Sequence, residues 1–315
     1  MMKVSLIGLP SSGRTVFLTL LYETMVGRAN ESSGGRDFDF RLSTDPQYAR
    51  ILGELRTNLS MGNWPPRTEE AVGYSIRLGR SKRLSRKHDI IDLTVVDLPG
   101  WPTREGRECD VISEPNFVLE KSLPGSDVLI FFLDASRVKS VRNLKAGNVR
   151  ATYDSMMADC IKRSLGFVAK TSLSRSPDHG AHVMTVFSKF DLINEGFILR
   201  TGLKSPPPSI FDQKGRFDKE ALASRRRYGQ RILHSHLPAT KTAIIEAGKE
   251  FPEVTWGAYF FCGLETDTDR HGRRVPKIRP VNSLLSLAYA RDEYSGVLEY
   301  LWTVGVSVPN AVKTE

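Results

Sequence analysis

The sequence predicts an α/β fold, a three-layer sandwich in which helices cover both faces of a mostly parallel sheet. Apolar runs of strand length alternate along the 315 residues with longer segments of helical periodicity. Several runs are apolar at nearly every position, which is typical of strands buried on both faces of a parallel sheet. The N-terminal segment is the third observation, because a strand, a glycine-bracketed loop and a helical pattern follow one another within residues 2–22.

The expected elements alternate from one end of the chain to the other. Strands are expected at Lys3–Gly8, Gly73–Leu78, Ile90–Asp97, Asp127–Leu133, His182–Ser188 and Thr255–Cys262. Helices are expected at Thr15–Val26, Pro46–Leu59, Ala151–Ala169, Lys219–His234, Thr240–Glu250 and near Gly296–Thr303. Polar or proline-rich composition predicts surface loops at Asn30–Arg36, Thr201–Lys214 and Thr266–Pro280. We expect one domain over residues 1–315, with a helical insertion over residues 195–250.

Composition excludes several classes of protein. Hydrophobic residues make up 40% of the chain, enough for a globular core, and no uncharged apolar run reaches membrane-spanning length. The three cysteines lie far apart without C-x-x-C spacing, so we expect neither structural zinc nor a disulfide framework. The N-terminus begins a strand at once and has no signal-peptide pattern, so we expect a cytoplasmic protein without a transmembrane segment.

The formal net charge of +9 raises the question of an acidic partner. Basic residues cluster at Arg80–His88 and Arg225–Arg227. The first cluster lies between two expected strands and contains no aromatic residue that could stack on a base. A solvated hairpin loop is the favoured interpretation, and a nucleic acid, membrane surface or acidic protein is the alternative.

The segment GLPSSGRT, Gly8–Thr15, has the spacing of a phosphate-binding P-loop, G-x-x-x-x-G-K-[ST], except that Arg14 replaces lysine. In such a loop, backbone N–H groups converge on phosphate oxygens, and the helix N-terminus adds a partial positive charge. The candidate phosphate-binding residues are Gly8, Ser11, Ser12, Gly13, Arg14, Thr15 and Val16.

Two further segments are candidates for holding Mg²⁺ and sensing a terminal phosphate. Asp97 ends an apolar run and begins D-L-P-G, so its carboxylate can hold Mg²⁺ through a water, and Gly100 lets its N–H approach a γ-phosphate. Thr68 ends the loop Gly62–Thr68 and can complete the coordination of the metal. The plainer alternatives are an ordinary turn at Asp97 and a proline-rich connector at Thr68.

Two segments are candidates for recognising a base. In Ser188–Asp191, SKFD, the Asp191 carboxylate can accept from both N1–H and the amino group of guanine, whereas adenine offers an acceptor at N1. The Lys189 stem can lie across the purine face, and the Ser188 hydroxyl can bind the P-loop. The alternative is that Asp191 only caps a following helix. In Phe260–Gly263, backbone N–H groups at Cys262 and Gly263 could meet guanine O6, or the segment could be a plain exit from a strand.

These motifs, in this order, resemble the translation-factor-related and Ras-like class of P-loop GTPases over residues 1–265. The pattern G-x-W-P-x-x-T at residues 62–68 further resembles double-GTPase-type domains of bacterial signalling and conflict systems. The resemblance implies a G-domain fold that binds GTP or GDP with Mg²⁺. It implies phosphate and metal roles for Gly8, Gly13, Arg14 and Thr15, a second switch at Asp97 and Gly100, and guanine recognition by Lys189 and Asp191.

Two departures from the family pattern bear on activity. Arg14 is bulkier than lysine, and although it can fork onto phosphate oxygens, it is not an equivalent point charge. Trp101 follows D-L-P-G where Ras-like proteins carry a water-orienting glutamine, and an indole cannot orient that water. Arg67 could reach the phosphate as a finger in cis, and Glu105 could orient water, but a solvated arginine is the commoner case at a switch.

The sequence thus predicts a slow GTPase that switches loops near Thr68 and Asp97 for a protein effector or regulator. A homo- or heterodimer is a candidate assembly. Two alternatives stay open: a pseudo-GTPase that binds nucleotide without turnover, and a basic nucleic-acid-associated NTPase. No H-E-x-x-H or G-x-S-x-G pattern supports another hydrolase.

Overall fold

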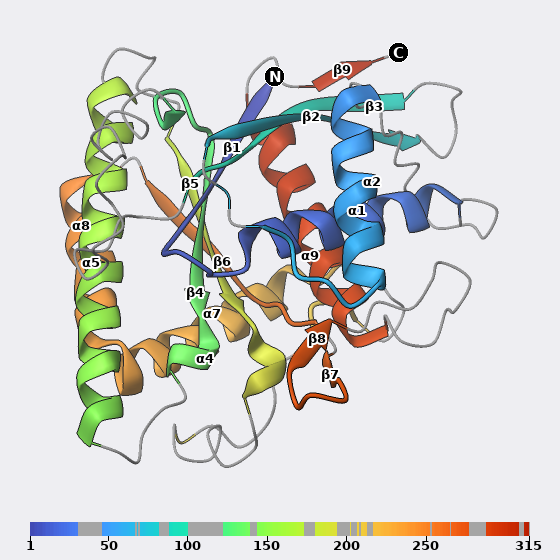
Figure 1. Ribbon diagram of the computed structural model, residues 1–315. Coiled ribbons are helices and arrows are strands. Elements are labelled where there is room, and N and C mark those ends of the chain that lie inside the picture. The colour runs from blue at the N-terminus through green and yellow to red at the C-terminus, as the bar shows by residue number, and fades with distance from the viewer. Residues whose placement is uncertain are drawn as a thin grey trace.

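A computed structural model gives the fold of the chain (Figure 1). The residues that it describes are 1–30, 46–66, 68, 70–81, 88–99, 122–138, 144–172, 180–193, 202, 207, 209–212, 217–252, 254–264, 266–276, 288–308 and 312–314. The predicted Arg67 and Gly100, together with Trp101 and Glu105, lie outside these ranges.

A twisted sheet forms the centre of the molecule and confirms the predicted α/β class. Its strands are β1 (Met2–Gly8), β2 (Val72–Ser81), β3 (His88–Asp97), β4 (Val128–Asp134), β5 (His182–Ser188), β6 (Thr255–Phe261) and β9 (Val312–Thr314). The order is β2-β3-β1-β4-β5-β6, with β9 also pairing with β3. The pairs β3–β1, β1–β4, β4–β5 and β5–β6 are parallel, whereas β2 and β9 run antiparallel to β3.

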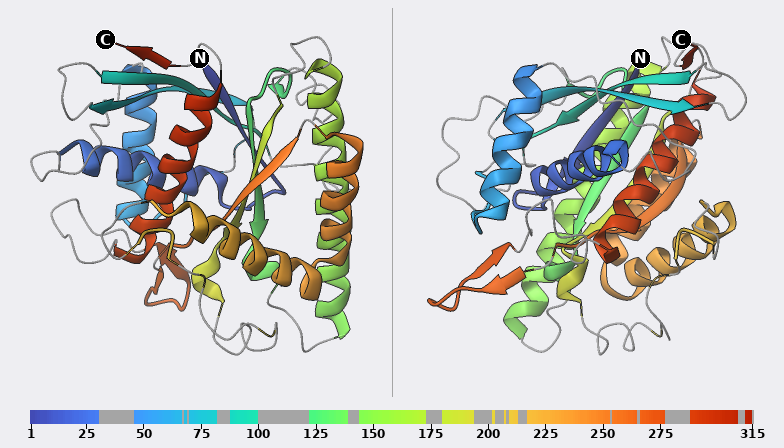
Figure 2. Two further views of the ribbon diagram at one scale, coloured as in Figure 1. Left: turned by 180° about the vertical axis from the view of Figure 1, so that it is seen from behind. Right: turned by 90° about the vertical axis from the view of Figure 1, so that its right-hand side faces the viewer.

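Helices cover both faces of this sheet. They are α1 (Arg14–Asn30), α2 (Pro46–Ser60), α4 (Ala135–Val138), α5 (Leu144–Ser172), α7 (Lys219–His236), α8 (Pro238–Glu250) and α9 (Ala288–Ser307), with a 3-10 turn η2 at Phe190–Leu192. Figures 1 and 2 show α5 and α8 side by side on one face, and α1 and α9 on the other. None of the helices in the described ranges combines the length and hydropathy needed to cross a lipid bilayer.

The central strand β4 shows how the sequence produces these layers. All seven of its residues are buried. Because successive side chains of a strand point to opposite faces, Ile130 and Phe132 pack in the core beneath α1 and α9, and Phe131 and Leu133 pack in the core beneath α5 and α8. A continuous apolar run is therefore what a strand with two covered faces requires.

Among the described residues, β6 is the last strand in the order of the sheet, and charged side chains cover its outer edge. Arg225 of α7 donates from Nε to the Tyr259 carbonyl at 3.2 Å, and Glu293 of α9 accepts from the Phe261 N–H at 2.9 Å. The Arg225 guanidinium also donates to Glu293 Oε1 at 2.6 Å. One ion pair thus satisfies two backbone groups at the edge of the sheet, where buried polar groups would otherwise lack partners.

The segment 266–276 differs from its prediction. It was expected to be a loop because its sequence is polar and punctuated. Instead, β7 (Thr266–Thr268) and β8 (Arg274–Pro276) form a separate antiparallel hairpin. Its turn is closed by Asp269, which accepts from the backbone of His271 and Arg273, each at 2.8 Å. Local hydrogen bonds therefore order a segment with no apolar periodicity. The helical insertion at 195–250 stays a prediction; the described part of it contains α7 and α8.

Candidate functional site

The loop between β1 and α1 has the geometry of a phosphate cradle. Ser11 and Gly13 have positive φ angles of 61° and 85°, which turn the backbone between strand and helix. Gly8 leaves no space for a side chain, because an added Cβ would lie 2.7 Å from Ser12 Oγ and 3.0 Å from Phe132 Cβ. Since α1 begins at Arg14, the backbone N–H groups of its first turn point toward the loop. A helix N-terminus behind a glycine loop favours an anion.

Three oxygen-bearing side chains from different elements meet beside this loop. The Thr15 hydroxyl donates to Asp97 Oδ2 at 2.9 Å, and the Thr68 hydroxyl lies 2.8 Å from the Thr15 hydroxyl and 3.2 Å from Asp97 Oδ2. Burial raises the pKa of Asp97, an effect that Arg14 and the two hydroxyls oppose. Asp97 Oδ1 accepts no hydrogen bond from the described residues. Hydroxyl and carboxylate oxygens are the ligands that Mg²⁺ prefers, so this set fits that ion.

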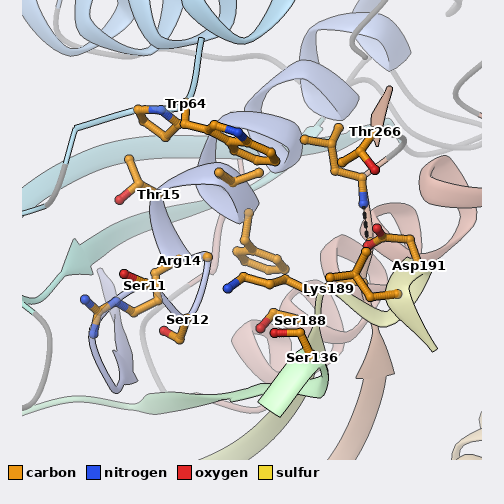
Figure 3. Close-up of a pocket in the computed structure, with 18 of the residues that line it drawn as sticks. Ser11, Ser12, Arg14, Thr15, Trp64, Ser136, Ser188, Lys189, Asp191 and Thr266 are labelled. Atoms are coloured by element: carbon orange, nitrogen blue, oxygen red, sulfur yellow. Dashed lines mark hydrogen bonds between the residues drawn. The ribbon is translucent and has the colours of Figure 1, made fainter. Parts of the chain in front are cut away.

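Arg14 lies beneath the loop, where it holds the ends of two strands together. Its Nη1 donates to the Gly8 carbonyl at 2.7 Å and to the Pro99 carbonyl at 3.4 Å. Its Nε lies 3.5 Å from Asp97 Oδ1, and only 6% of its side chain is exposed. Figure 3 shows the guanidinium at the end of the pocket opposite Asp191. Arg14 is thus a structural cation in this arrangement as well as a candidate phosphate ligand.

The other end of the site is formed where β4, β5 and β6 end. Lys189 adopts a left-handed backbone with φ of 54°, and its Nζ donates to Asp134 Oδ2 at 2.6 Å. Asp191 Oδ1 accepts from the Leu264 N–H at 3.2 Å. Burial raises the pKa of Asp191, whereas hydrogen bonds and the cations Arg274 and Lys189 lower it. A cation and a carboxylate are therefore held side by side next to the loop after β6.

Gly263 allows that loop to approach Asp191. An added Cβ at Gly263 would lie 2.7 Å from Asp191 Oδ1 and 2.9 Å from the Asp191 backbone nitrogen. The Cys262 carbonyl accepts from the Phe190 N–H at 3.0 Å, and Cys262 itself is fully buried. The segment of Cys262 and Gly263 thus packs directly on the SKFD segment.

A single cavity of about 460 Å³ connects the two ends (Figure 3). The predicted residues that line it are Ser11, Ser12, Gly13, Arg14, Thr15, Val16, Thr68, Ser188, Lys189, Asp191, Cys262 and Gly263. Gly8 and Asp97 are not among the lining residues, but they accept hydrogen bonds from residues that are: Gly8 from Arg14, and Asp97 from Thr15 and Thr68. Residues more than 250 positions apart in the sequence therefore share one pocket, as the predicted site requires. Whether they bind nucleotide stays a prediction.

Sequence reasoning missed several lining residues. Among them are Ser136, Thr266, Arg274 and Tyr294, together with Trp64, which was part of a motif but received no role. It also missed Asp134, the partner of Lys189. For Asp134 a signal was present, because it ends the apolar run of β4 as Asp97 ends that of β3. The hairpin and α9 carry no local signal of this kind.

No family model matches the chain, and no curated protein matches it by sequence. Among solved structures, the chain is similar to the signal recognition particle receptor SRb-GTP/SRX complex from Chaetomium thermophilum. The identity is 14%, the match covers 83% of this chain and 93% of that chain, and the TM-score is 0.36. The fold is P-loop GTPase-like. That assignment follows from this chain's own strand order, with the glycine loop after β1 and Asp97 at the end of the neighbouring β3.

Proposed function

We propose that this protein binds GTP and GDP together with Mg²⁺ and hydrolyses GTP slowly. The main support is the cavity that has a glycine loop and the Thr15–Thr68–Asp97 cluster at one end and Asp191 with Lys189 at the other. This arrangement separates a site for anionic oxygens from a site for a base.

Guanine suits the base end for a chemical reason. A carboxylate can only accept hydrogen bonds when ionised, and guanine presents two neighbouring donors, N1–H and the amino group. Asp191 has one oxygen on the Leu264 N–H and faces the cavity. The Lys189 stem, held by Asp134, gives an aliphatic surface for the purine ring.

The residues that would hold Mg²⁺ are Thr15 and Thr68 through their hydroxyls and Asp97 through a water. When bound, the ion would neutralise charge on the β- and γ-phosphates. The chain's own groups would do the rest: the loop N–H groups bind phosphate oxygens and orient the nucleotide. In hydrolysis a water attacks the γ-phosphorus as the bond to the bridging oxygen of GDP breaks, and phosphate leaves.

Slow turnover follows from Arg14. Its guanidinium is occupied by the Gly8 and Pro99 carbonyls and lies beside Asp97, so binding a phosphate requires it to exchange partners. A change in the loop of Thr68 on exchange of GTP for GDP would serve as a switch, read by a protein effector or regulator. We propose that the effector or regulator binds this protein in one nucleotide state and not in the other.

Titration calorimetry with GTP, GDP and ATP in the presence of Mg²⁺ tests the binding. We expect Thr15→Ala to weaken GTP binding at least about tenfold through loss of a metal ligand. Asp191→Asn should weaken guanine binding and tolerate xanthine, whose N1–H and carbonyl suit an amide. The matched controls are Thr57→Ala and Asp159→Asn on exposed helix surfaces, which should bind as the wild type does. Absence of heat from every guanine nucleotide would reject the proposal.

The second candidate is a pseudo-GTPase that binds nucleotide without turnover, and the buried contacts of Arg14 favour it. Measuring the release of phosphate from GTP distinguishes a GTPase from a pseudo-GTPase. Release that disappears in Thr15→Ala supports a GTPase, whereas tight binding without release above the buffer rate supports the pseudo-GTPase.

A further inference from the structure

The β7–β8 hairpin lies outside the central sheet and outside every motif of the sequence, yet it lines the cavity. Thr266 begins β7 and Arg274 begins β8, and both face the pocket. Figure 3 shows Thr266 beside Asp191. The hairpin therefore stands at the end of the cavity where the base would lie, away from Thr15 and Arg14.

Contacts from the loop of Thr68 hold the hairpin in this place. The Trp64 indole Nε1 donates to the Arg274 carbonyl at 3.0 Å. The two segments also pack closely, because a Cβ added at Gly62 would lie 3.6 Å from Val275 Cβ. Trp64 precedes Thr68 by four residues, so the hairpin and the candidate metal ligand belong to one connected surface.

The charge of Arg274 is available at the mouth of the cavity. Its side chain is exposed, and within the ranges that the structure describes it has no hydrogen-bond or ion-pair partner. By contrast, Lys189 is paired with Asp134. Arg274 lines the same cavity as Asp191, and its charge opposes the rise in the pKa of that carboxyl.

We propose that Arg274 is a binding residue for the purine base, and that Trp64 couples the hairpin to the loop of Thr68. This inference rests on the proposed function. A guanidinium suits the site because it can lie over an aromatic ring or donate to the O6 and N7 acceptors of guanine. Arg274 could thus donate to O6 and N7 of a guanine whose N1–H and amino group donate to Asp191.

Binding of GTP, ATP and inorganic tripolyphosphate to Arg274→Ala tests the proposal. We expect GTP affinity to fall about tenfold, as for loss of a desolvated cation–ring contact, with little change for tripolyphosphate. A general disturbance of the pocket would weaken both ligands. Arg270→Ala is the matched control, since it removes the same charge from the same hairpin outside the cavity lining. Arg274→Lys should keep part of the affinity.

The fluorescence of Trp64 reports whether the hairpin and the loop of Thr68 are coupled. GTP should change the indole fluorescence of the wild type, and the Trp64→Phe difference spectrum identifies the signal among the four tryptophans. Arg274→Ala should diminish that change at saturating GTP. Equal GTP affinity of Arg274→Ala and Arg270→Ala overturns this inference alone. A wild type that binds no guanine nucleotide overturns the proposed function, and this inference with it.

Discussion

Arg14 and Asp97 form a buried ion pair beneath the glycine loop, with 3.5 Å between Arg14 Nε and Asp97 Oδ1. Arg14 comes from the start of α1 and Asp97 from the end of β3, so the pair ties the loop to the neighbouring strand. Arg14, which replaces the usual P-loop lysine, thus pairs with Asp97 and is also a candidate to bind phosphate.

Replacing Arg14 should separate these two roles. Arg14→Met leaves the Asp97 carboxylate buried without its cation, and we expect a loss of about 1–3 kcal/mol in the free energy of unfolding, measured with urea. Arg14→Lys restores a compact charge and should raise the rate of phosphate release from GTP about tenfold relative to the wild type. A lysine variant no faster than the wild type would show that Arg14 does not limit turnover.

The pH dependence of binding should report Asp191. Its pKa is raised, chiefly by burial, although the Leu264 N–H and the cations Arg274 and Lys189 oppose this. The ionised carboxylate is the form that accepts from guanine, so GTP affinity should fall as the pH drops through the raised pKa. In Asp191→Asn, the change of GTP affinity with pH reports the titration of GTP itself. The difference between the wild-type and variant profiles therefore reports the titration of Asp191. Parallel profiles would contradict the assignment.

The same shift has the opposite effect on the stability of the free protein. Because the folded pKa of Asp191 lies above the unfolded value, its contribution to stability is fully present below the unfolded pKa. It is lost as the pH rises through the folded pKa. Urea unfolding at several pH values should therefore show that the advantage of Asp191→Asn over the wild type grows from acid to neutral pH.

Gly263 should be intolerant of any side chain. In Gly263→Ala the new Cβ meets Asp191, so the SKFD segment and the loop after β6 must move apart. We expect GTP affinity to fall at least about tenfold, because a displaced Asp191 cannot align with the base. Gly166→Ala on α5 is the control, since nothing lies within 4 Å of its added Cβ. Titration calorimetry measures the GTP affinity of both variants. Similar affinities would show that Gly263 is not needed for the position of Asp191.

The pair Arg225 and Glu293 should contribute to stability through β6. Arg225→Met leaves Glu293 buried without its cation and the Tyr259 carbonyl without its donor, at an expected cost of about 3–5 kcal/mol. Adding Glu293→Gln removes the stranded charge but keeps an acceptor for the Phe261 N–H. The double variant should therefore lose less than the sum of the single variants, by at least about 1 kcal/mol.

A surface pair calibrates this measurement. Arg163→Met breaks the exposed pair with Asp159 on α5 and should change the free energy of unfolding by less than about 1 kcal/mol. If Arg225→Met costs no more than Arg163→Met, the covered edge of β6 does not depend on the ion pair.

Local patterns were sufficient to predict most of the fold. The run that became β4 is apolar up to Asp134 at its end, and a strand of this kind requires two covering layers. The shorter apolar runs in β1 and β5 indicate strands in the same way, and both strands are buried on both faces. The glycine loop was predictable because its spacing lies within eight neighbouring residues, and Gly13 has the positive φ that a glycine adopts readily. The close approach of Phe132 to Gly8 is a tertiary contact that no local pattern indicates. The hairpin at 266–276 was not predictable in this way, since its order comes from polar turn contacts.

The sequence by itself determined the alternation of buried strands and helices, the phosphate-type loop after the first strand, and the carboxylates at the ends of β3 and β5. These features depend on residues that are neighbours in the chain. Only the tertiary structure decided that Arg14 pairs with Asp97, Lys189 with Asp134, and Trp64 with the backbone of Arg274. Such partners lie 55 to 210 positions apart, and packing of the sheet and its helices, not any local pattern, brings them into contact.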